Sequence, residues 1–257
     1  MRLYINLKIA LKSILNNKVQ SLVSILGLGI GLGSIILILM LYMHENSFDK
    51  YIPENDQVFR VIHGTNSTTP FILWETAKND IPSVDEFFRY YQSREFEIRL
   101  SDNDIIEENR FACADASIFN ILGIEFIIGK TAESRDEVAI SEKMAKKYFP
   151  DGNAMNQILE VRLNNEFINL NVCGIFKDFP SNSSLSPNFV SHTNLIDEFL
   201  GTQEKRLGEY GSEVVTFKTN WERDVCITYL KINAKSNARD VTEQLQKYSD
   251  RFESESK

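Results

Sequence analysis

A run of twenty-five uncharged residues, Val19–Met43, constrains this chain more than any other feature. An α-helix needs about 20 apolar residues to cross the hydrocarbon core of a bilayer, so the run is long enough to span a membrane once. A cleaved secretory signal is the alternative, but its apolar core has about 7–15 residues and leads into a small-residue cleavage site. Positions 42–45 read YMHE instead. The sequence therefore favours an uncleaved transmembrane helix over 19–43.

The charges on either side of the run orient this helix. Residues 1–18 contain four basic residues and no acidic one, so of the formal net charge of −8 the remainder carries −12. Lys and Arg beside a span stay on the cytoplasmic side. We therefore expect a single-pass protein of the bacterial cytoplasmic (inner) membrane with a cytoplasmic N-terminus. The acidic remainder, residues 44–257, is expected outside, and its charge disfavours nucleic acid as a partner.

Residues 1–18 are predicted to form a cytoplasmic, basic, amphipathic segment. Such a helix lies in the membrane surface, although a plain cytoplasmic extension of the transmembrane helix fits equally well. Apolar residues recur at helical spacing with two lysines on another face: Leu3, Leu7, Leu11 and Ile14, against Lys8 and Lys12.

Four glycines occupy every second position within the run: Gly27, Gly29, Gly31 and Gly33. They form two overlapping G-x-x-x-G pairs on different faces of a helix. Small residues at this spacing let two helix backbones approach closely in lipid. Gly is also common in membrane helices generally, but it lowers helix propensity. We therefore interpret the four glycines as helix-packing residues that contact other transmembrane helices.

The part outside the membrane has the composition of a globular domain, and its pattern predicts the α+β class. Asp115 and Ser141 are expected to cap two helices, and the Ser- and Pro-rich stretch 179–188 is expected to be a loop. Asn164-Asn165 marks a hairpin turn. Strands are predicted at 57–63, 87–91, 96–100, 105–113, 137–140, 158–163, 166–175 and 225–232, and helices at 73–81, 115–122, 142–148 and 238–252.

No arrangement of residues predicts catalysis, a metal site or a cofactor. Gly129-Lys130-Thr131 imitates a phosphate loop, but the first glycine of that motif would fall on Ile124. The serines at 181, 183 and 184 lie near His192 in sequence without a nucleophile motif around them. The three cysteines, Cys113, Cys173 and Cys226, are expected to be buried thiols, and the sequence leaves their disulfide state open.

Four segments, in order, resemble the MacB/FtsX-like permease family of bacterial ABC transporters. They are residues 44–61, the stretch ADASIFNILGIEFIIGK (114–130), an "ISE-x-x-A-x-x-x-F" segment within 137–159, and a "V-x-G-V-x-K-D-x-P-x-x-S" segment within 172–190. The residues in register with the last two patterns are Ser141, Glu142, Ala145, Phe149, Gly174, Lys177, Asp178, Pro180 and Ser183.

The resemblance implies a non-enzymatic, permease-type subunit of an ABC transporter, or a fragment of one. Its extracytoplasmic mixed α/β domain would have a porter-like lobe and an inserted lobe, and would couple ATP-driven helix motion to a substrate or partner, by export or mechanotransmission. The partners that the resemblance implies are the membrane, a cytoplasmic ABC ATPase, and either other permease helices or a second permease copy with which the subunit would form a dimer.

The chain departs from the family pattern after Met43, because no second apolar run of 18 residues follows. We therefore expect the 44–257 domain to be C-terminally incomplete and the later helices of the family to be missing. An alternative is a membrane-anchored sensor or binding domain that no longer belongs to a transporter. A third, an anchored hydrolase, would require Ser183 or Ser184 beside His192 in a polar cleft.

Overall fold

A computed structural model describes residues 16–255 together with Ile5 and Lys12, apart from positions 94, 102, 103, 164, 165, 201, 202, 208–210, 216 and 222. The chain divides into two compact units, Met1–Phe48 and Asp49–Lys257. The predicted surface segment, residues 1–18, lies almost wholly outside the described residues, and its conformation stays a prediction.

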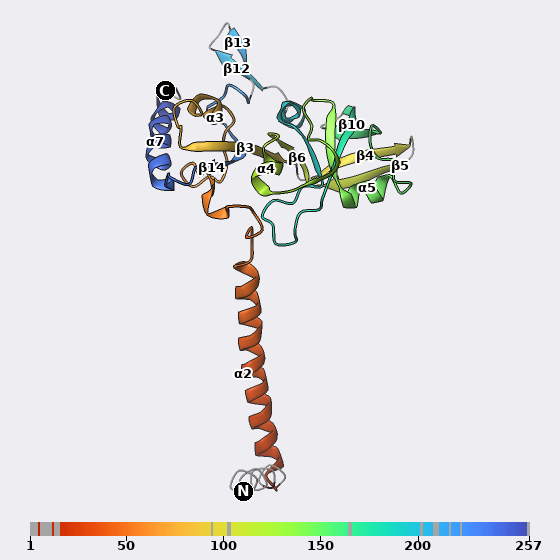
Figure 1. Cartoon of the computed structure of the whole chain (residues 1–257), viewed down its shortest axis with the longest axis vertical. Helices are drawn as coiled ribbons and strands as arrows, with labels where there is room; N and C mark the ends of the chain where they lie inside the picture. The colour runs from red at the N-terminus through yellow and green to blue at the C-terminus, as the bar shows by residue number, and fades with distance from the viewer. Residues whose placement is uncertain are drawn as a thin grey trace. The chain divides into compact units, whose positions relative to one another are not determined.

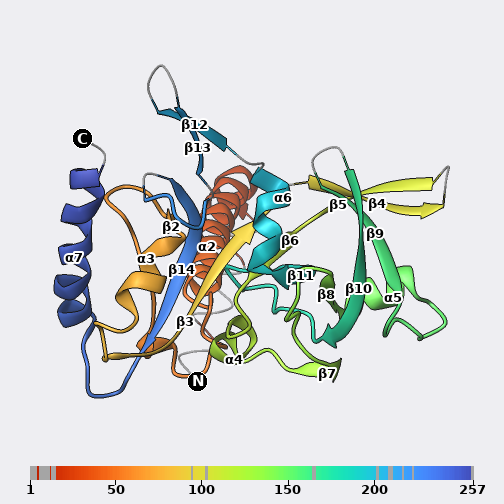
Figure 2. The same cartoon turned by 90° about the horizontal axis from the view of Figure 1, so that it is seen from above.

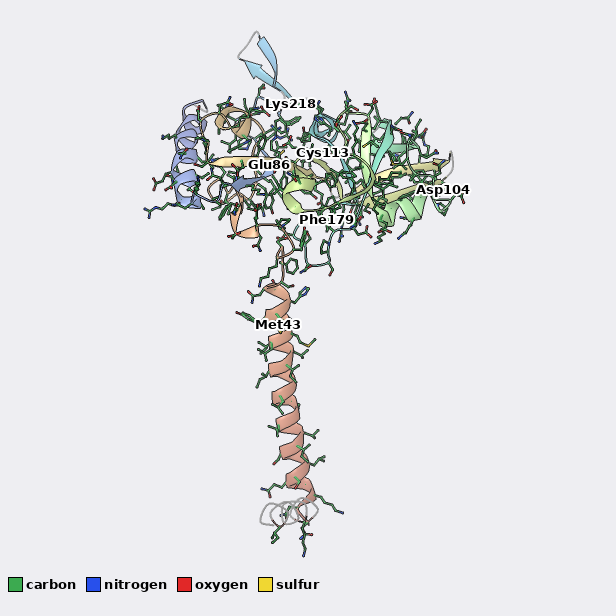
Figure 3. All side chains as sticks on the ribbon, viewed as in Figure 1. Met43, Glu86, Asp104, Cys113, Phe179 and Lys218 are labelled. Carbon is green, nitrogen blue, oxygen red and sulfur yellow. The ribbon has the colours of Figure 1, made fainter. Side chains whose placement is uncertain are left out.

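The first unit is dominated by one long helix, α2 (Lys18–Glu45), which contains the whole of the predicted span. None of its residues is buried, and side chains such as Met43 project outward from it (Figure 3). Its most apolar stretch has a mean hydropathy of 2.6. Among the described residues it is the one helix that is long and apolar enough to cross a bilayer.

The second unit is built on a mixed sheet of twelve strands (Figures 1 and 2). Two neighbouring pairs, β10–β8 and β11–β6, are parallel, and the other pairings are antiparallel. In sheet order the strands are β1 (Val58–Arg60), β14 (Asp224–Ile232), β3 (Val84–Gln92), β6 (Phe111–Ala114), β11 (Phe189–His192), β8 (Glu137–Ser141), β10 (Glu166–Phe176), β9 (Ile158–Leu163), β4 (Glu95–Ser101) and β5 (Asp104–Asn109). In addition, β2 (Thr69–Pro70) pairs with β14, and β7 (Phe126–Gly129) pairs with β10.

Strand β14 lies between β1 and β3, although β1 and β3 are close neighbours along the chain. Leu230 of β14 pairs with Phe59 on one side and Phe87 on the other. Helix α3 (Ile72–Ala77) connects β1 to β3, and α7 (Ala238–Glu255) follows β14 and lies beside α3 (Figure 2). This end of the sheet therefore begins with the first strand of the domain and is completed by the last.

Short helices and one hairpin accompany the rest of the sheet. They are α4 (Ile118–Leu122), α5 (Glu142–Tyr148), α6 (Ile196–Leu200) and the 3-10 turns η1 (Asn55–Gln57) and η2 (Thr193–Leu195). Strands β12 (Gln203–Leu207) and β13 (Gly211–Val215) form a separate two-stranded hairpin that projects from the domain (Figure 1).

The core falls into three clusters of buried apolar side chains. The largest is rich in phenylalanine: the ring centroid of Phe96 lies 5.1 Å from that of Phe111 and 5.2 Å from that of Phe189. A second cluster packs α4 against the sheet. The third holds α3 and α7 against β14 through Trp74 and Val241. The predicted α+β class, with one N-terminal helix before a mixed α/β domain, is confirmed.

Two local predictions were wrong. The predicted strand 105–113 is two strands, because Arg110 adopts a left-handed conformation (φ 64°) that ends β5 and redirects the chain into β6. The predicted helix 115–122 begins only at Ile118, and Ser117, not Asp115, precedes it. The carboxylate of Asp115 is engaged by Arg89 instead.

Candidate functional site

The four predicted packing glycines lie on the described part of α2. A Cβ atom built at Gly27, Gly29, Gly31 or Gly33 would meet nothing within 4 Å outside the helix itself. Contacts within this chain therefore do not explain why these four positions are glycine. That the glycines contact other helices stays a prediction.

In the domain, residues of the four family-like segments take part in contacts that hold neighbouring elements together. We call each such contact a joint. The first joint is an ion pair between Arg89 of β3 and Asp115, directly after β6. Arg89 Nε lies 2.8 Å from Asp115 Oδ2, and a second guanidinium nitrogen lies 2.8 Å from Oδ1. Only 5% of Arg89 is exposed. Burial alone would lower its pKa, but the hydrogen bonds and the charge of Asp115 outweigh burial and raise that pKa.

The same guanidinium also reaches α3. It donates to the carbonyl oxygen of Phe71 at 3.3 Å, lies over the Phe71 ring at 3.7 Å, and approaches Glu75 Oε1 at 3.2 Å. Arg89 thereby ties the helix to the sheet with charge-assisted bonds, which are the strong ones among protein hydrogen bonds.

The second joint is the N-terminus of α5, where the third and fourth family-like segments meet. Ser141 Oγ accepts a hydrogen bond from the amide of Met144 at 3.4 Å, as the predicted cap requires. Asp178, from the loop after β10, accepts from the amide of Lys143 at 3.1 Å. A carboxylate is favoured at a helix N-terminus, so Asp178 fastens that loop to α5.

The third joint is the close approach of β7 to β10, which requires two glycines. A Cβ at Gly174 would lie 2.2 Å from the carbonyl oxygen of Lys130, and a Cβ at Gly129 would lie 2.3 Å from that of Cys173. Gly129 also has a φ of 79°. Its place at the end of strand β7 shows that Gly129-Lys130-Thr131 does not precede a helix, as a phosphate loop would.

The fourth joint links the first and fourth family-like segments. Asp49 and Tyr51 hydrogen-bond to the loop around Ser183. The Ser183 hydroxyl donates to the carbonyl oxygen of Leu185, whereas His192 Nδ1 accepts from the amide of Asn194. The structure therefore gives Ser183 and His192 separate structural tasks and does not make them a nucleophile and its base.

The three cysteines are free thiols, and all three are buried. Cys113, labelled in Figure 3, belongs to β6, Cys173 to β10 and Cys226 to β14. Burial raises the pKa of Cys173 and of Cys226 to about 12, and raises that of Cys113 as well. Within the described part of the chain, no group of three or more His, Cys, Asp or Glu residues is arranged to hold a metal ion.

A groove of about 480 Å³ lies among β1, β14, α3 and α7. Two of its polar side chains are already bonded: Arg60 donates to the carbonyl oxygen of Ser67, and Thr69 Oγ1 lies 2.8 Å from Thr228 Oγ1. The groove therefore offers an apolar surface in place of an activated nucleophile. Its apolar lining includes Phe59, Val61, Ile62, Leu73, Val241 and Leu245.

The sequence indicated the residues of some of these joints but not of others. The Ser141 cap and the glycines at 129 and 174 lie in recognisable motifs. Arg89 carried no such signal, because its partner lies 26 positions away and its burial depends on the fold.

Comparison with known proteins identifies a matching family and solved structures with a similar fold. Residues 21–248 match the model of a family described as MacB-like periplasmic core domain. The structure is similar to a domain of a permease protein from Porphyromonas gingivalis, with a TM-score of 0.62 and 20% identity over 78% of this chain and 86% of that one. It is also similar to the periplasmic region of MacB from Actinobacillus actinomycetemcomitans, with a TM-score of 0.51 and 13% identity over 74% and 80%. No protein with a curated description matches the chain.

Proposed function

Because the chain belongs to the family of MacB-like periplasmic core domains of ABC transporter permeases, we propose that it is a membrane-anchored permease-type subunit. In this proposal the domain after α2 is extracytoplasmic and couples ATP-driven motion of the helix to a substrate or a partner, by export or by mechanotransmission. The subunit lies in the bacterial inner membrane with residues 1–18 in the cytoplasm.

One observation carries the proposal: a domain of this family follows directly on a 28-residue apolar helix that buries none of its residues within the chain. A lone anchor needs apolar length but no glycine pairs, whereas helices that associate in lipid use small residues to bring backbones together. Gly27 with Gly31 and Gly29 with Gly33 supply such faces. We therefore assign α2 to packing on other permease helices or on a second copy.

The proposed source of motion is a cytoplasmic ABC ATPase, because the domain itself has no feature of nucleotide chemistry among its described residues. The ATPase would act on the membrane helices, and α2 would carry the motion across the bilayer. The alternative function, an anchored sensor or binding domain, shares the fold and the helix but needs neither the ATPase nor the glycine faces.

Co-purification tests the proposal. The full chain is expressed in its own host with an affinity tag and recovered from membranes in mild detergent. We expect an ABC ATPase and other permease helices, or a second copy, among the recovered proteins. Gly27→Leu plus Gly31→Leu should reduce recovery of the helix partner roughly tenfold, since a loss of about 1.4 kcal/mol is tenfold in affinity.

Two further variants sharpen the test. Gly29→Leu plus Gly33→Leu reports on the other face of the helix, and Ile36→Leu plus Met40→Leu conserves volume at the same spacing and should leave recovery unchanged. Recovery of the chain only as a free monomer, unaffected by either glycine variant, would contradict the proposal and favour the anchored binding domain.

A further inference from the structure

We propose that the residues directly after α2 form a latch, through which motion of that helix reaches the loop joining β10 to β11. The latch consists of Asp49 and Tyr51 on one side and Asn182, Ser183 and Ser184 on the other. The inference rests on the proposed function for the source of the motion, but the latch itself is a property of the domain alone.

Asp49 holds the loop through two groups. Its amide donates to the carbonyl oxygen of Asn182 at 2.9 Å, and its Oδ1 accepts from the amide of Ser184 at 2.8 Å. Asp49 has a φ of 57°, a left-handed conformation that is unfavourable for most residues but more accessible to Asp. The two hydrogen bonds compensate for this conformation, so the joint is set in one geometry.

Tyr51 adds a side-chain bond two residues later. Its hydroxyl lies 2.6 Å from Ser183 Oγ, which itself donates to the carbonyl oxygen of Leu185 at 2.5 Å. The proton between the first two oxygens therefore comes from Tyr51. Burial raises the pKa of Tyr51 to about 12, although the hydrogen bond with Ser183 acts in the opposite direction. The phenol thus stays neutral and keeps its proton throughout the physiological range.

The residues that follow Tyr51 are fixed as well. Ile52 is buried in the second core cluster. The ring of Pro53 lies against Gly123, where a Cβ atom would come within 2.6 Å of the proline Cδ. Glu54 pairs with Lys231 of β14 at 2.6 Å. All residues of the segment 49–54 except the exposed Lys50 are therefore held by a bond or by packing, and the contacts of Asp49 are with the loop.

Only a few residues of the chain separate this segment from the helix. The amides of Asn46 and Ser47 donate back to the carbonyl oxygens of Tyr42 and His44, each at 3.0 Å. Asp49 lies only four positions after Glu45, the last residue of α2. The first strand, β1, starts nine residues after Asp49. A displacement that leaves the helix therefore meets the latch before it meets the sheet.

The loop passes such a displacement to the middle of the sheet. At its start, Lys177 pairs with Glu125 at 2.5 Å and Asp178 caps α5. At its end, the amide of Asn188 donates to the carbonyl oxygen of Arg110, and the carbonyl of Asn188 accepts from the amide of Ser141, both at 2.9 Å. The loop is therefore connected to β10, to β8 and to the junction of β5 with β6.

The first experiment measures the latch without any partner. The full chain is placed in nanodiscs of phosphatidylethanolamine and phosphatidylglycerol, and hydrogen exchange is followed at the amides of Asp49 and Ser184. Asp49→Gly combined with Tyr51→Phe removes both side-chain bonds and relieves the left-handed residue. We expect exchange at Ser184 to become roughly tenfold faster or more, with β8 and β10 unchanged.

A matched control is Glu54→Gly combined with Tyr42→Phe. Glu54 also has a left-handed conformation (φ 52°) and a paired carboxylate, and Tyr42 is an exposed tyrosine of α2. This control should leave exchange at Ser184 as in the unmodified chain. Equal exchange at Ser184 in the unmodified chain and the latch variant would overturn the proposal, and so would an equal effect of the control.

The second experiment measures transmission in the co-purified complex. A nitroxide on Ser181→Cys, an exposed loop position, reports the mobility of the loop when ATP is added. We expect ATP to change the spectrum in the unmodified chain and the control. The latch variant should lose this change although the ATPase still co-purifies. An ATP-dependent change that persists in the latch variant overturns the proposal. A failure to recover any ATPase refutes the proposed function instead, and leaves the exchange experiment to decide the latch.

Discussion

At the scale of the residue, Arg89 shows how this domain keeps a charge inside its core. The guanidinium has 5% exposure and is bonded by Asp115, by the Phe71 carbonyl and by Glu75. A buried charge is tolerated when its hydrogen bonds are made, and removing one partner leaves the other uncompensated. The stability of the α3 end of the sheet therefore depends on an aspartate that the sequence had suggested as a helix cap.

Asp115→Asn should destabilise the full chain strongly. It leaves the buried Arg89 charge with only the partly exposed Glu75 as a counter-ion, and breaking a buried pair costs about 3–5 kcal/mol. Glu75→Gln is the control: the Glu75 side chain is 44% exposed, and exposed pairs contribute about 0–1 kcal/mol. Urea unfolding in detergent, followed by tryptophan fluorescence, measures both. Similar losses for the two variants would contradict the account of Arg89.

The cysteines give a pH-dependent prediction. The pKa of Cys173 and of Cys226 is about 12 in the folded chain, against 9.0 for an exposed thiol. Because the reactive species is the thiolate, a thiol reagent at pH 8 should modify none of the three cysteines in the folded protein and all three in urea. Mass spectrometry counts the adducts, and rapid modification of the folded chain would refute the prediction.

The same shift has a consequence for stability. Cys173 and Cys226 have a pKa of 9.0 when exposed and of about 12 in the folded chain, so the folded state binds more protons between these values. The free energy of unfolding should therefore be insensitive to these groups below pH 9 and should fall as pH rises from 9 towards 12.

At the scale of the element, the sequence predicted what local interactions determine. The helix α5 was found where Ser141 and its periodic pattern indicated, and β9 and β10 pair antiparallel as predicted. The predicted turn itself, Asn164-Asn165, lies outside the described residues. The strands β7 and β11 were missed because each has only four residues. Such strands have too little pattern of their own and are stabilised by partners far along the chain. The split of β5 from β6 was missed because nothing in the sequence around Arg110 indicates that this residue adopts a left-handed backbone conformation.

The start of α5 should respond to both of its caps. Ser141→Ala and Asp178→Ala should each lower the free energy of unfolding by about 1 kcal/mol, since each leaves an amide of the first turn without its acceptor. Asp136→Ala, an exposed carboxylate that bonds only locally to Ser134, is the control and should cost less. Thermal unfolding of the full chain ranks the three, and a harmless Asp178→Ala would argue against the joint between the loop and α5.

At the scale of the whole molecule, the sequence predicted the helix, the fold class and the family, which the structure and the comparisons confirm. It did not predict the strand order, because pairings such as Val58 with Lys231 depend on contacts that no local pattern encodes. Of the candidate site, the motif glycines and the Ser141 cap were visible in advance. The bonds of Asp49 and Tyr51 to the loop were not, since their partners lie more than 130 positions away.

The charges around α2 predict an orientation of this helix in the membrane. With four basic residues in 1–18 and an acidic remainder, we expect an N-terminal tag to be cytoplasmic and the domain to be outside. Protease added to spheroplasts should digest the domain and leave the tag protected. Protection of the domain together with loss of the tag would reverse the assignment, and a detergent-lysed sample controls for intrinsic resistance.

The position of β14 between β1 and β3 also governs how the domain can be made. Translation delivers the chain from its N-terminus at about 5–20 residues per second, and β1 acquires its sheet partner only when Tyr229, Leu230 and Lys231 have emerged. Until then the apolar face of α3 lacks Leu230 and Ile232 to pack against. Folding slows as the sequence separation of contacting residues grows. The first-made end of the sheet therefore cannot complete its pairing until β14 has emerged, and until then the nascent domain exposes it to chaperones and proteases.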